Sequence, residues 1–97
     1  MQLESSKIET IQRYFKTCPV IKAYLFGSYV KNTVTKTSDI DILVELDYSK
    51  NVGLEFIQMR IDLEKLLSQK VDLVSSRGLS KYIQPIIELE KELIYAR

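Results

Sequence analysis

The sequence predicts an α/β fold of the α+β type, in which a small mixed β-sheet is flanked by helices. Two segments, 20–26 and 40–46, have the apolar alternation of β-strands. The segments around them instead repeat apolar residues every three or four positions, which is typical of helices. Because helices and short strands alternate along the chain, we expect the helices to pack mainly on one side of the sheet.

Length and composition narrow the class of protein. The 97 residues suit one domain, spanning residues 1–97, with a single hydrophobic core. The formal net charge of +1 provides no electrostatic argument for a nucleic-acid partner. One cysteine and no histidine exclude a disulfide, a Ser-His-Asp triad and a zinc cluster within the chain, and they suit a reducing cytoplasm. No apolar run is long enough to cross a membrane, and any bound metal is expected to be a hard ion held by carboxylates.

The first helix is predicted over residues 7–16, where apolar side chains recur at helical spacing: Ile8, Ile11 and Phe15. Ser6 and Glu9 have the spacing of a capping box, with the serine as N-cap. The helix is expected to end before Pro19, because proline disfavours helical geometry in the preceding residue. Cys18 is interpreted as a small buried side chain rather than a nucleophile, since no basic neighbour in sequence would lower its pKa.

The remaining elements follow from the same patterns. After the first strand, one or two helical turns are predicted over 29–34. A helix is predicted over 54–68 from a broad apolar stripe: Phe56, Met59, Leu63, Leu66 and Leu67. A short strand over 71–74 and a final helix over 82–94 complete the order, with Pro85 in the first helical turn, where proline is tolerated.

Two aspartates carry the strongest chemical signal. Asp39 and Asp41 are two positions apart on one strand, so their side chains project from the same face. Two such carboxylates repel each other when ionised, and a divalent cation between them would remove that conflict. Pairs of ions bridged in this way serve phosphoryl and nucleotidyl transfer. Asp72 interrupts another apolar strand, and it would supply a third carboxylate if the two strands are neighbours.

The Gly27–Ser28 turn supplies the phosphate half of the predicted site. Glycine lets the backbone turn sharply and approach a ligand closely, and Ser28 can add a hydroxyl donor. Lys31 would place a positive charge near the same phosphates. An attacking hydroxyl would be activated by the metal or by Asp72. Tyr29 and Tyr48 could touch a base, with contact to a partner or plain packing as equal alternatives.

Simpler interpretations exist for each residue. Asp39 could merely end a loop, a Gly-Ser pair is a common turn, and most lysines are only solvated. Asp41 and Asp72 are harder to explain in this way, because each interrupts an apolar strand. The fixed spacing of Gly27–Ser28 and Asp39–Ile40–Asp41 therefore favours the metal and phosphate site.

At these residues the chain resembles the minimal nucleotidyltransferase family, a branch of the DNA polymerase beta-like superfamily. The characteristic motif of the family is Gly-Ser, then ten residues, then Asp-x-Asp, with a third aspartate on a later strand. Residues 88–95 are also similar to the last helix of the family. The resemblance implies the polymerase beta-like fold and Mg²⁺-dependent transfer of a nucleoside monophosphate from a triphosphate such as ATP. It also implies roles for individual residues. Asp39, Asp41 and Asp72 would be catalytic and would bind about two Mg²⁺ ions. Gly27 and Ser28 would bind the nucleotide, beside Lys31.

Lys31 and Asn32 depart from the Gly-Ser-x-Ala-Arg-Gly run that the family often has, so the planar fork of an arginine is missing. Single-domain members typically act as antitoxins. The resemblance therefore implies that the chain adenylylates a tyrosine of a HEPN-domain ribonuclease toxin, which is its expected partner. Two alternatives stay open: an antitoxin that neutralises by binding alone, and a nucleotidyltransferase for a small molecule or nucleic acid. We expect the acceptor or a second subunit to complete the cleft, so homo- and hetero-oligomers both stay open.

Overall fold

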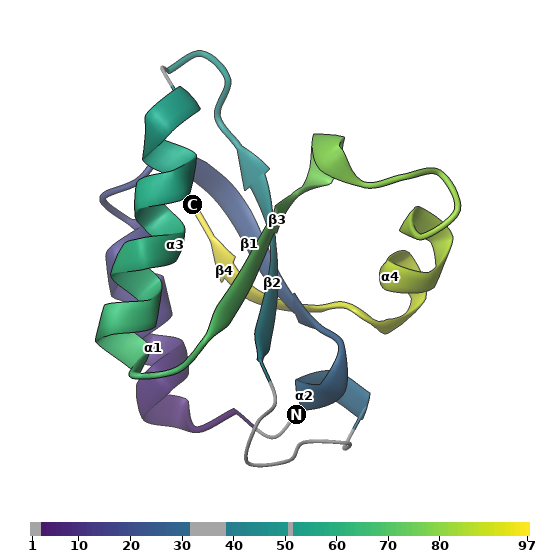
Figure 1. Cartoon of the computed structure of the whole chain (residues 1–97), viewed down its shortest axis with the longest axis horizontal. Coiled ribbons are helices and arrows are strands. Elements are labelled where there is room, and N and C mark those ends of the chain that lie inside the picture. Colours follow the sequence, from purple (N-terminus) through teal and green to yellow (C-terminus); the bar gives the residue numbers. More distant parts are fainter. Residues whose placement is uncertain (1–2, 32–38, 51) are drawn as a thin grey trace.

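The computed structural model describes residues 3–31, 39–50 and 52–97. In chain order, the elements are α1 (Ser5–Phe15), β1 (Val20–Phe26), α2 (Ser28–Lys31), β2 (Ile40–Leu46), α3 (Gly53–Leu67), β3 (Val71–Ser75), a short 3₁₀ turn (Ser76–Gly78), α4 (Gln84–Glu90) and β4 (Glu92–Ala96). Figure 1 shows α1 and α3 side by side along the strands, with α4 on the other side of the molecule. In these three ranges, no helix is both long and apolar enough to cross a lipid bilayer.

The described strands form one mixed sheet in the order β3-β2-β1-β4. β2 pairs with β1 in antiparallel register and with β3 in parallel register, while β4 runs antiparallel along the other edge of β1. The parallel pair is joined through α3, as parallel neighbours require a crossover connection. The predicted α/β class, with a small mixed sheet flanked by helices, is confirmed.

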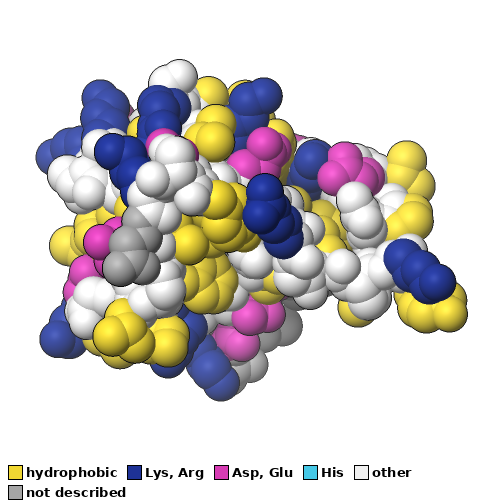
Figure 2. Space-filling view, turned by 90° about the horizontal axis from the view of Figure 1, so that it is seen from above, with side chains coloured by type: hydrophobic (Ala, Val, Ile, Leu, Met, Phe, Trp, Pro, Cys, Tyr) yellow, Lys and Arg dark blue, Asp and Glu magenta, His cyan; other side chains and the backbone are white. Residues whose placement is uncertain are grey.

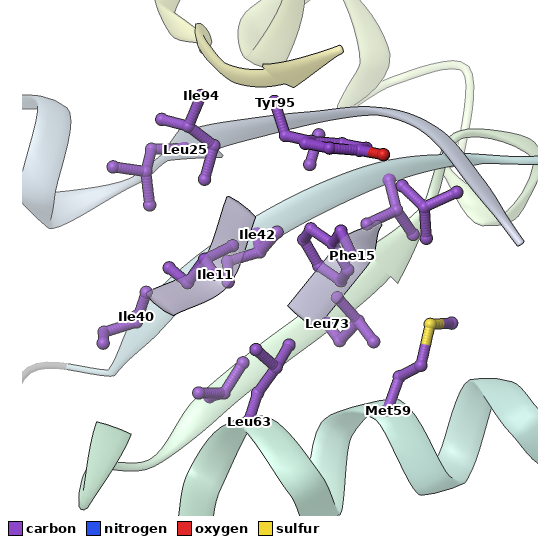
Figure 3. Close-up of a cluster of buried hydrophobic side chains, with 14 of the residues drawn as sticks. Ile11, Phe15, Leu25, Ile40, Ile42, Met59, Leu63, Leu73, Ile94 and Tyr95 are labelled. Atoms are coloured by element: carbon purple, nitrogen blue, oxygen red, sulfur yellow. The ribbon is translucent and has the colours of Figure 1, made fainter. Parts of the chain in front are cut away.

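The main hydrophobic core lies between the sheet and the pair of helices α1 and α3. Figure 3 shows the side chains that meet there: Ile11, Phe15, Met59, Leu63, Ile40, Ile42 and Leu73. Phe15, Ile42 and Leu63 are completely buried. Burying one such side chain contributes roughly 1.5–3 kcal/mol, so this packing fixes the position of β2 within the sheet. Since β2 carries Asp41, the core also fixes the backbone of the candidate site.

The apolar stripe of α3 is narrower than its sequence predicts. Met59, Leu63 and Leu67 are buried at four-residue spacing, but Leu66 is 52% exposed. The helix itself lies within one residue of the predicted range. It ends at Leu67, and its C-cap, Ser68, has a φ of 51°. A helix that covers only one face of a sheet needs one row of buried side chains, so the neighbouring row stays in solvent.

The predicted capping box at the start of α1 is wrong. The helix begins at Ser5, with Glu4 as its N-cap and without a side-chain cap. The Glu4 carbonyl already accepts hydrogen bonds from the backbone N–H groups of Lys7 and Ile8. Ser6 therefore lies inside the first turn, where its side chain cannot act as an N-cap.

The end of the predicted final helix is also wrong. α4 ends at Glu90, Lys91 is extended, and residues 92–96 form β4. This strand pairs Tyr95 with Ala23 and Leu93 with Tyr24 of β1. The edge of β1 has backbone N–H and C=O groups that need partners. Their hydrogen bonds to residues 92–96 stabilise a strand there more than the local apolar spacing stabilises a helix. The similarity of residues 88–95 to a last helix therefore holds only up to Glu90.

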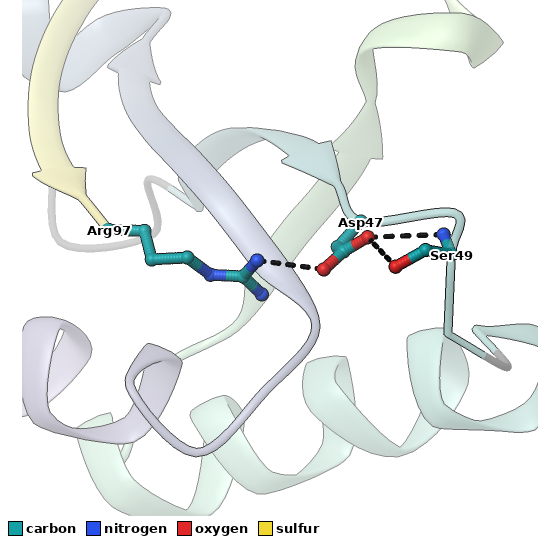
Figure 4. A network of polar contacts seen from close by, with 3 residues as sticks. All are labelled: Asp47, Ser49 and Arg97. Atoms are coloured by element: carbon teal, nitrogen blue, oxygen red, sulfur yellow. Dashed lines mark hydrogen bonds and ion pairs between the residues drawn. The ribbon is translucent and has the colours of Figure 1, made fainter.

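The end of β4 is tied to the end of β2 by a small polar network. Figure 4 shows Arg97 reaching Asp47, with 2.7 Å between Nη1 and Oδ2, while the other carboxylate oxygen of Asp47 accepts hydrogen bonds from Ser49. The Ser49 hydroxyl, and then Arg97, lower the pKa of Asp47 from 3.8 to about 2. This network lies at the opposite end of β2 from Asp41.

Candidate active site

Strand register brings three sequence-distant segments together at one end of the sheet. The parallel pairing of β2 with β3 places Asp41 directly opposite Asp72. The antiparallel pairing of β1 with β2 places Asp41 opposite Phe26, the residue before Gly27. Asp39 lies just before β2 and is half-buried, whereas Asp72 is exposed. The Gly27 turn and the three predicted aspartates therefore lie on, or directly beside the ends of, adjoining strands.

Gly27 lies in contact with the carboxylate of Asp41. Its φ of +76° is in the left-handed region that side chains with a Cβ rarely adopt. A Cβ at this position would also come within 2.1 Å of Asp41 Oδ2. Two independent constraints therefore require glycine here, and the second arises only because Asp41 points at the turn.

The electrostatics of the site centre on Asp41. Burial, and then the negative charges of Asp72, Asp39 and Glu90 in that order, together raise the pKa of its carboxyl from 3.8 to about 6. Asp41 is thus close enough to both other predicted aspartates to feel their charge. After burial, the rest of the pKa shift reflects the repulsion among carboxylates that the sequence spacing predicts.

The donor chemistry of these residues fits a divalent cation such as Mg²⁺. Carboxylates are the ligands that hard cations prefer, and a cation would relieve the repulsion that raises the pKa of Asp41. Within the described ranges, however, no three Asp, Glu, Cys or His side chains are grouped so that they could hold one ion. The structure thus aligns Asp41 with Asp72, while the metal site of Asp39, Asp41 and Asp72 stays a prediction.

The groups predicted to hold phosphates make contacts with a residue that the sequence did not single out. The backbone N–H of Gly27 donates a hydrogen bond to Glu90 Oε1, at an N···O distance of 3.1 Å. Lys31 Nζ lies 3.1 Å from the other oxygen, Glu90 Oε2. The Glu90 side chain is 16% exposed, while Lys31 is 55% exposed. Ser28 begins α2 and is half-buried beside them.

One signal in the sequence could have indicated Glu90. It follows Ile87 by three residues and Ile83 by seven, so the three residues share one face of a helix. A glutamate on the face that carries the buried Ile87 needs a polar partner. Its actual partners, Gly27 and Lys31, could not be identified from α4 alone, because they lie about sixty residues earlier in the chain.

Tyr29 and Tyr48, the two tyrosines considered as contacts for a base, both pack against other residues of the protein. Tyr29 is buried at 7% exposed, and its hydroxyl accepts a hydrogen bond from Gln69 Nε2, so packing explains it. Tyr48 follows the far end of β2, and its ring lies 3.8 Å from the guanidinium carbon of Arg77. β2 separates Tyr48 from Asp41 by roughly 20 Å of strand, so of the alternatives left open for Tyr48 the structure favours packing against Arg77.

A model of the family described as "Nucleotidyltransferase domain" matches residues 5–96. The chain belongs to this family. The nucleotidyltransferase domain described here thus includes the whole sheet and each of the predicted site residues. The family predicted from the Gly-Ser and Asp-x-Asp motifs is confirmed.

This nucleotidyltransferase is similar to proteins of Methanocaldococcus jannaschii and Thermococcus cleftensis. It is 40% identical over 73 residues to MJ1379 of Methanocaldococcus jannaschii, a candidate protein adenylyltransferase, with 73% of this chain and 71% of that protein covered. It is 37% identical over 71 residues to the protein adenylyltransferase MntA of Thermococcus cleftensis, with 73% and 69% covered. A crystal structure of a toxin-antitoxin with AMP-PNP superposes with a TM-score of 0.76 at 26% identity, over 98% of this chain and 75% of that chain.

Proposed function

We propose that this nucleotidyltransferase is a Mg²⁺-dependent protein adenylyltransferase. It transfers AMP from ATP to a tyrosine hydroxyl of a HEPN-domain toxin, with release of pyrophosphate, and so acts as an antitoxin. The observation that carries the proposal is the register that sets Asp41 opposite Asp72 and against Gly27, in a chain of this family. Relatives named protein adenylyltransferase, and a similar structure of a toxin-antitoxin with an ATP analogue, support the choice of donor and acceptor.

Each residue has a chemical role in this reaction. Asp39, Asp41 and Asp72 would hold Mg²⁺, which neutralises phosphate charge and helps to ionise the attacking hydroxyl. Gly27 leaves room for the Asp41 carboxylate beside the triphosphate. Ser28 would donate its hydroxyl to a phosphate oxygen, and Lys31 would contribute a positive charge.

Asp72 is the residue best placed to meet the acceptor. Its side chain is exposed, while Asp41 in the neighbouring strand is half-buried. An exposed carboxylate beside the nucleotide can accept the proton that the tyrosine hydroxyl loses. We therefore expect the toxin to approach from the side of β3. We place the reaction in the cytoplasm, where a chain with a single cysteine is stable as a free thiol.

The test is transfer of labelled AMP to the toxin. Purified protein, Mg²⁺, ATP labelled in the α-phosphate and a HEPN-domain toxin should yield a labelled toxin, and Asp39→Asn combined with Asp41→Asn should abolish the label. Glu9→Gln, an exposed carboxylate on α1, is the control and should transfer AMP as the wild type does. An unlabelled toxin, or equal labelling by the double variant, would contradict the proposal.

The same double variant separates catalysis from binding. An enzyme that inactivates the toxin by adenylylation cannot protect cells without its aspartates. If Asp39→Asn with Asp41→Asn protects a toxin-producing strain as well as the wild type does, the protein neutralises by contact alone. Protection should therefore be measured beside labelling, with the amount of soluble protein matched between strains.

A further inference from the structure

The carboxylate of Glu90 holds two groups that the proposed function assigns to the nucleotide. One oxygen accepts the backbone N–H of Gly27, and the other pairs with the ammonium of Lys31, each at 3.1 Å. We infer that Glu90 competes with the phosphates of ATP for these donors, so that ATP binding and the Glu90 contacts exclude each other. This inference rests on the proposed function, because it concerns the same phosphate groups.

The chemistry of the contacts supports competition. Carboxylate and phosphate oxygens are both anionic acceptors, and both use backbone N–H groups and lysine ammonium groups as donors. A triphosphate beside the bound Glu90 would also add negative charge to a site that already holds Asp41 and its neighbours. Glu90 contributes to the raised pKa of Asp41, which places its charge near the same point. The two anions therefore oppose each other both through shared donors and through repulsion.

The packing of α4 allows Glu90 to leave. Ile87 is the residue of α4 that is buried, so the helix is held by little apolar contact. Figure 2 shows hydrophobic side chains on the surface of the projecting lobe. Four large apolar side chains of α4 and of the two residues before it are exposed: Tyr82, Ile83, Ile86 and Leu89. Segments with few buried contacts open at low free-energy cost. A shift of α4, or a rotation of the Glu90 side chain, would free Gly27 and Lys31 for phosphate.

The alternative is that Glu90 assists the reaction, either by orienting Lys31 or by binding the metal. The two interpretations predict opposite changes in nucleotide affinity when Glu90 is neutralised. A competitor weakens nucleotide binding, so its neutralisation should strengthen binding. A supporting residue strengthens binding, so its neutralisation should weaken it. Glu90→Gln keeps the size of the side chain and removes its charge, so this variant distinguishes the two interpretations.

The experiment measures the Kd of ATP by isothermal titration calorimetry at fixed Mg²⁺, for the wild type, Glu90→Gln and Glu90→Ala. We expect both variants to bind ATP about fivefold more tightly, a change equivalent to about 1 kcal/mol. Glu88→Gln is the matched control, since Glu88 lies on the same helix, is 49% exposed and pairs with Lys91 instead. Its Kd for ATP should equal that of the wild type.

Adenosine provides a second control, because it lacks phosphates. Its affinity should be the same for the wild type and Glu90→Gln. Unchanged or weaker ATP binding in folded Glu90→Gln and Glu90→Ala, or an equal gain for adenosine, would overturn the inference and leave the proposed function standing. Absence of ATP binding by the wild type and both variants would overturn the proposed function, and the inference with it. Melting temperatures establish that each variant is folded.

Discussion

The close contact between Gly27 and Asp41 makes Gly27→Ala the most informative substitution in the site. An alanine there would keep a φ near +76° and would place its Cβ 2.1 Å from Asp41 Oδ2. The left-handed backbone costs roughly 1–2 kcal/mol for a residue with a Cβ. Turning the Asp41 carboxylate aside costs roughly another 0.5–1.5 kcal/mol. Alanine also restricts the unfolded chain, which returns about 0.4–1 kcal/mol.

The net loss of stability for Gly27→Ala is therefore about 0.5–3 kcal/mol, which lowers the Tm of a chain of this length by roughly 2–24 °C. AMP transfer should fall by about two orders of magnitude, because a misplacement of about 1 Å at a reacting centre has that effect. Urea unfolding gives the free energy, and single-turnover labelling of the toxin gives the rate. Gly78→Ala is the control glycine: its Cβ would meet Ser75 Oγ at 3.1 Å without a left-handed φ, so a change within about 0.5 kcal/mol is expected.

A double-mutant cycle isolates the contact with Asp41. In an Asp41→Ala background the carboxylate is gone, so Gly27→Ala should lose only the backbone contribution. Its effect on stability should then be smaller than in the wild type by roughly 1 kcal/mol. An equal loss in both backgrounds would refute the steric argument, and full activity of Gly27→Ala would refute the close approach itself.

Three other predictions concern charge and packing. Asp41→Asn should stabilise the protein by about 1–3 kcal/mol at pH 8 without Mg²⁺, because the pKa of Asp41 is raised to about 6 and its ionisation therefore opposes folding. Urea unfolding should show that this gain in stability vanishes below pH 4, where the Asp41 carboxyl is neutral in both the folded and the unfolded protein. Asp47→Asn should have the opposite pH dependence. Because the pKa of Asp47 is lowered to about 2 in the folded protein, its ionised carboxylate stabilises the wild type above about pH 4. The difference in stability between the wild type and Asp47→Asn should disappear as the pH falls through 2. Phe15→Ala should lose about 3–5 kcal/mol by urea unfolding, since the ring is completely buried, and a loss under 1 kcal/mol would contradict the described core.

The central strands were predictable because their signals are local. The observed β1 and β2 have the predicted bounds, 20–26 and 40–46. Each strand is bounded by residues that interrupt a strand, Pro19 and Gly27 for the first and Asp47 for the second. The two-residue period also puts Asp39 and Asp41 on one face without any knowledge of the fold.

The features that were missed depend on contacts between distant segments. Residues 92–96 continue a helical spacing, and only the free edge of β1 makes them a strand. The alignment of Asp72 with Asp41 needed the strand order, which periodicity cannot supply. Glu90 meets Gly27 across 63 positions in the chain, so its place in the site follows from the fold alone.

The site gathers more negative charge than stability alone would favour. Asp39, Asp72 and Glu90 all oppose the ionised form of Asp41, while Lys31, the cation in contact with Glu90, is largely in solvent. A sequence selected only for folding would replace Asp41 with an apolar or amide residue, since buried repulsion is costly. Retaining the carboxylate is understandable if its charge is needed when a cation and a triphosphate are bound. If Asp41→Asn destabilised the protein instead, the carboxylate would have a structural role, and this argument for a metal-dependent function would fail.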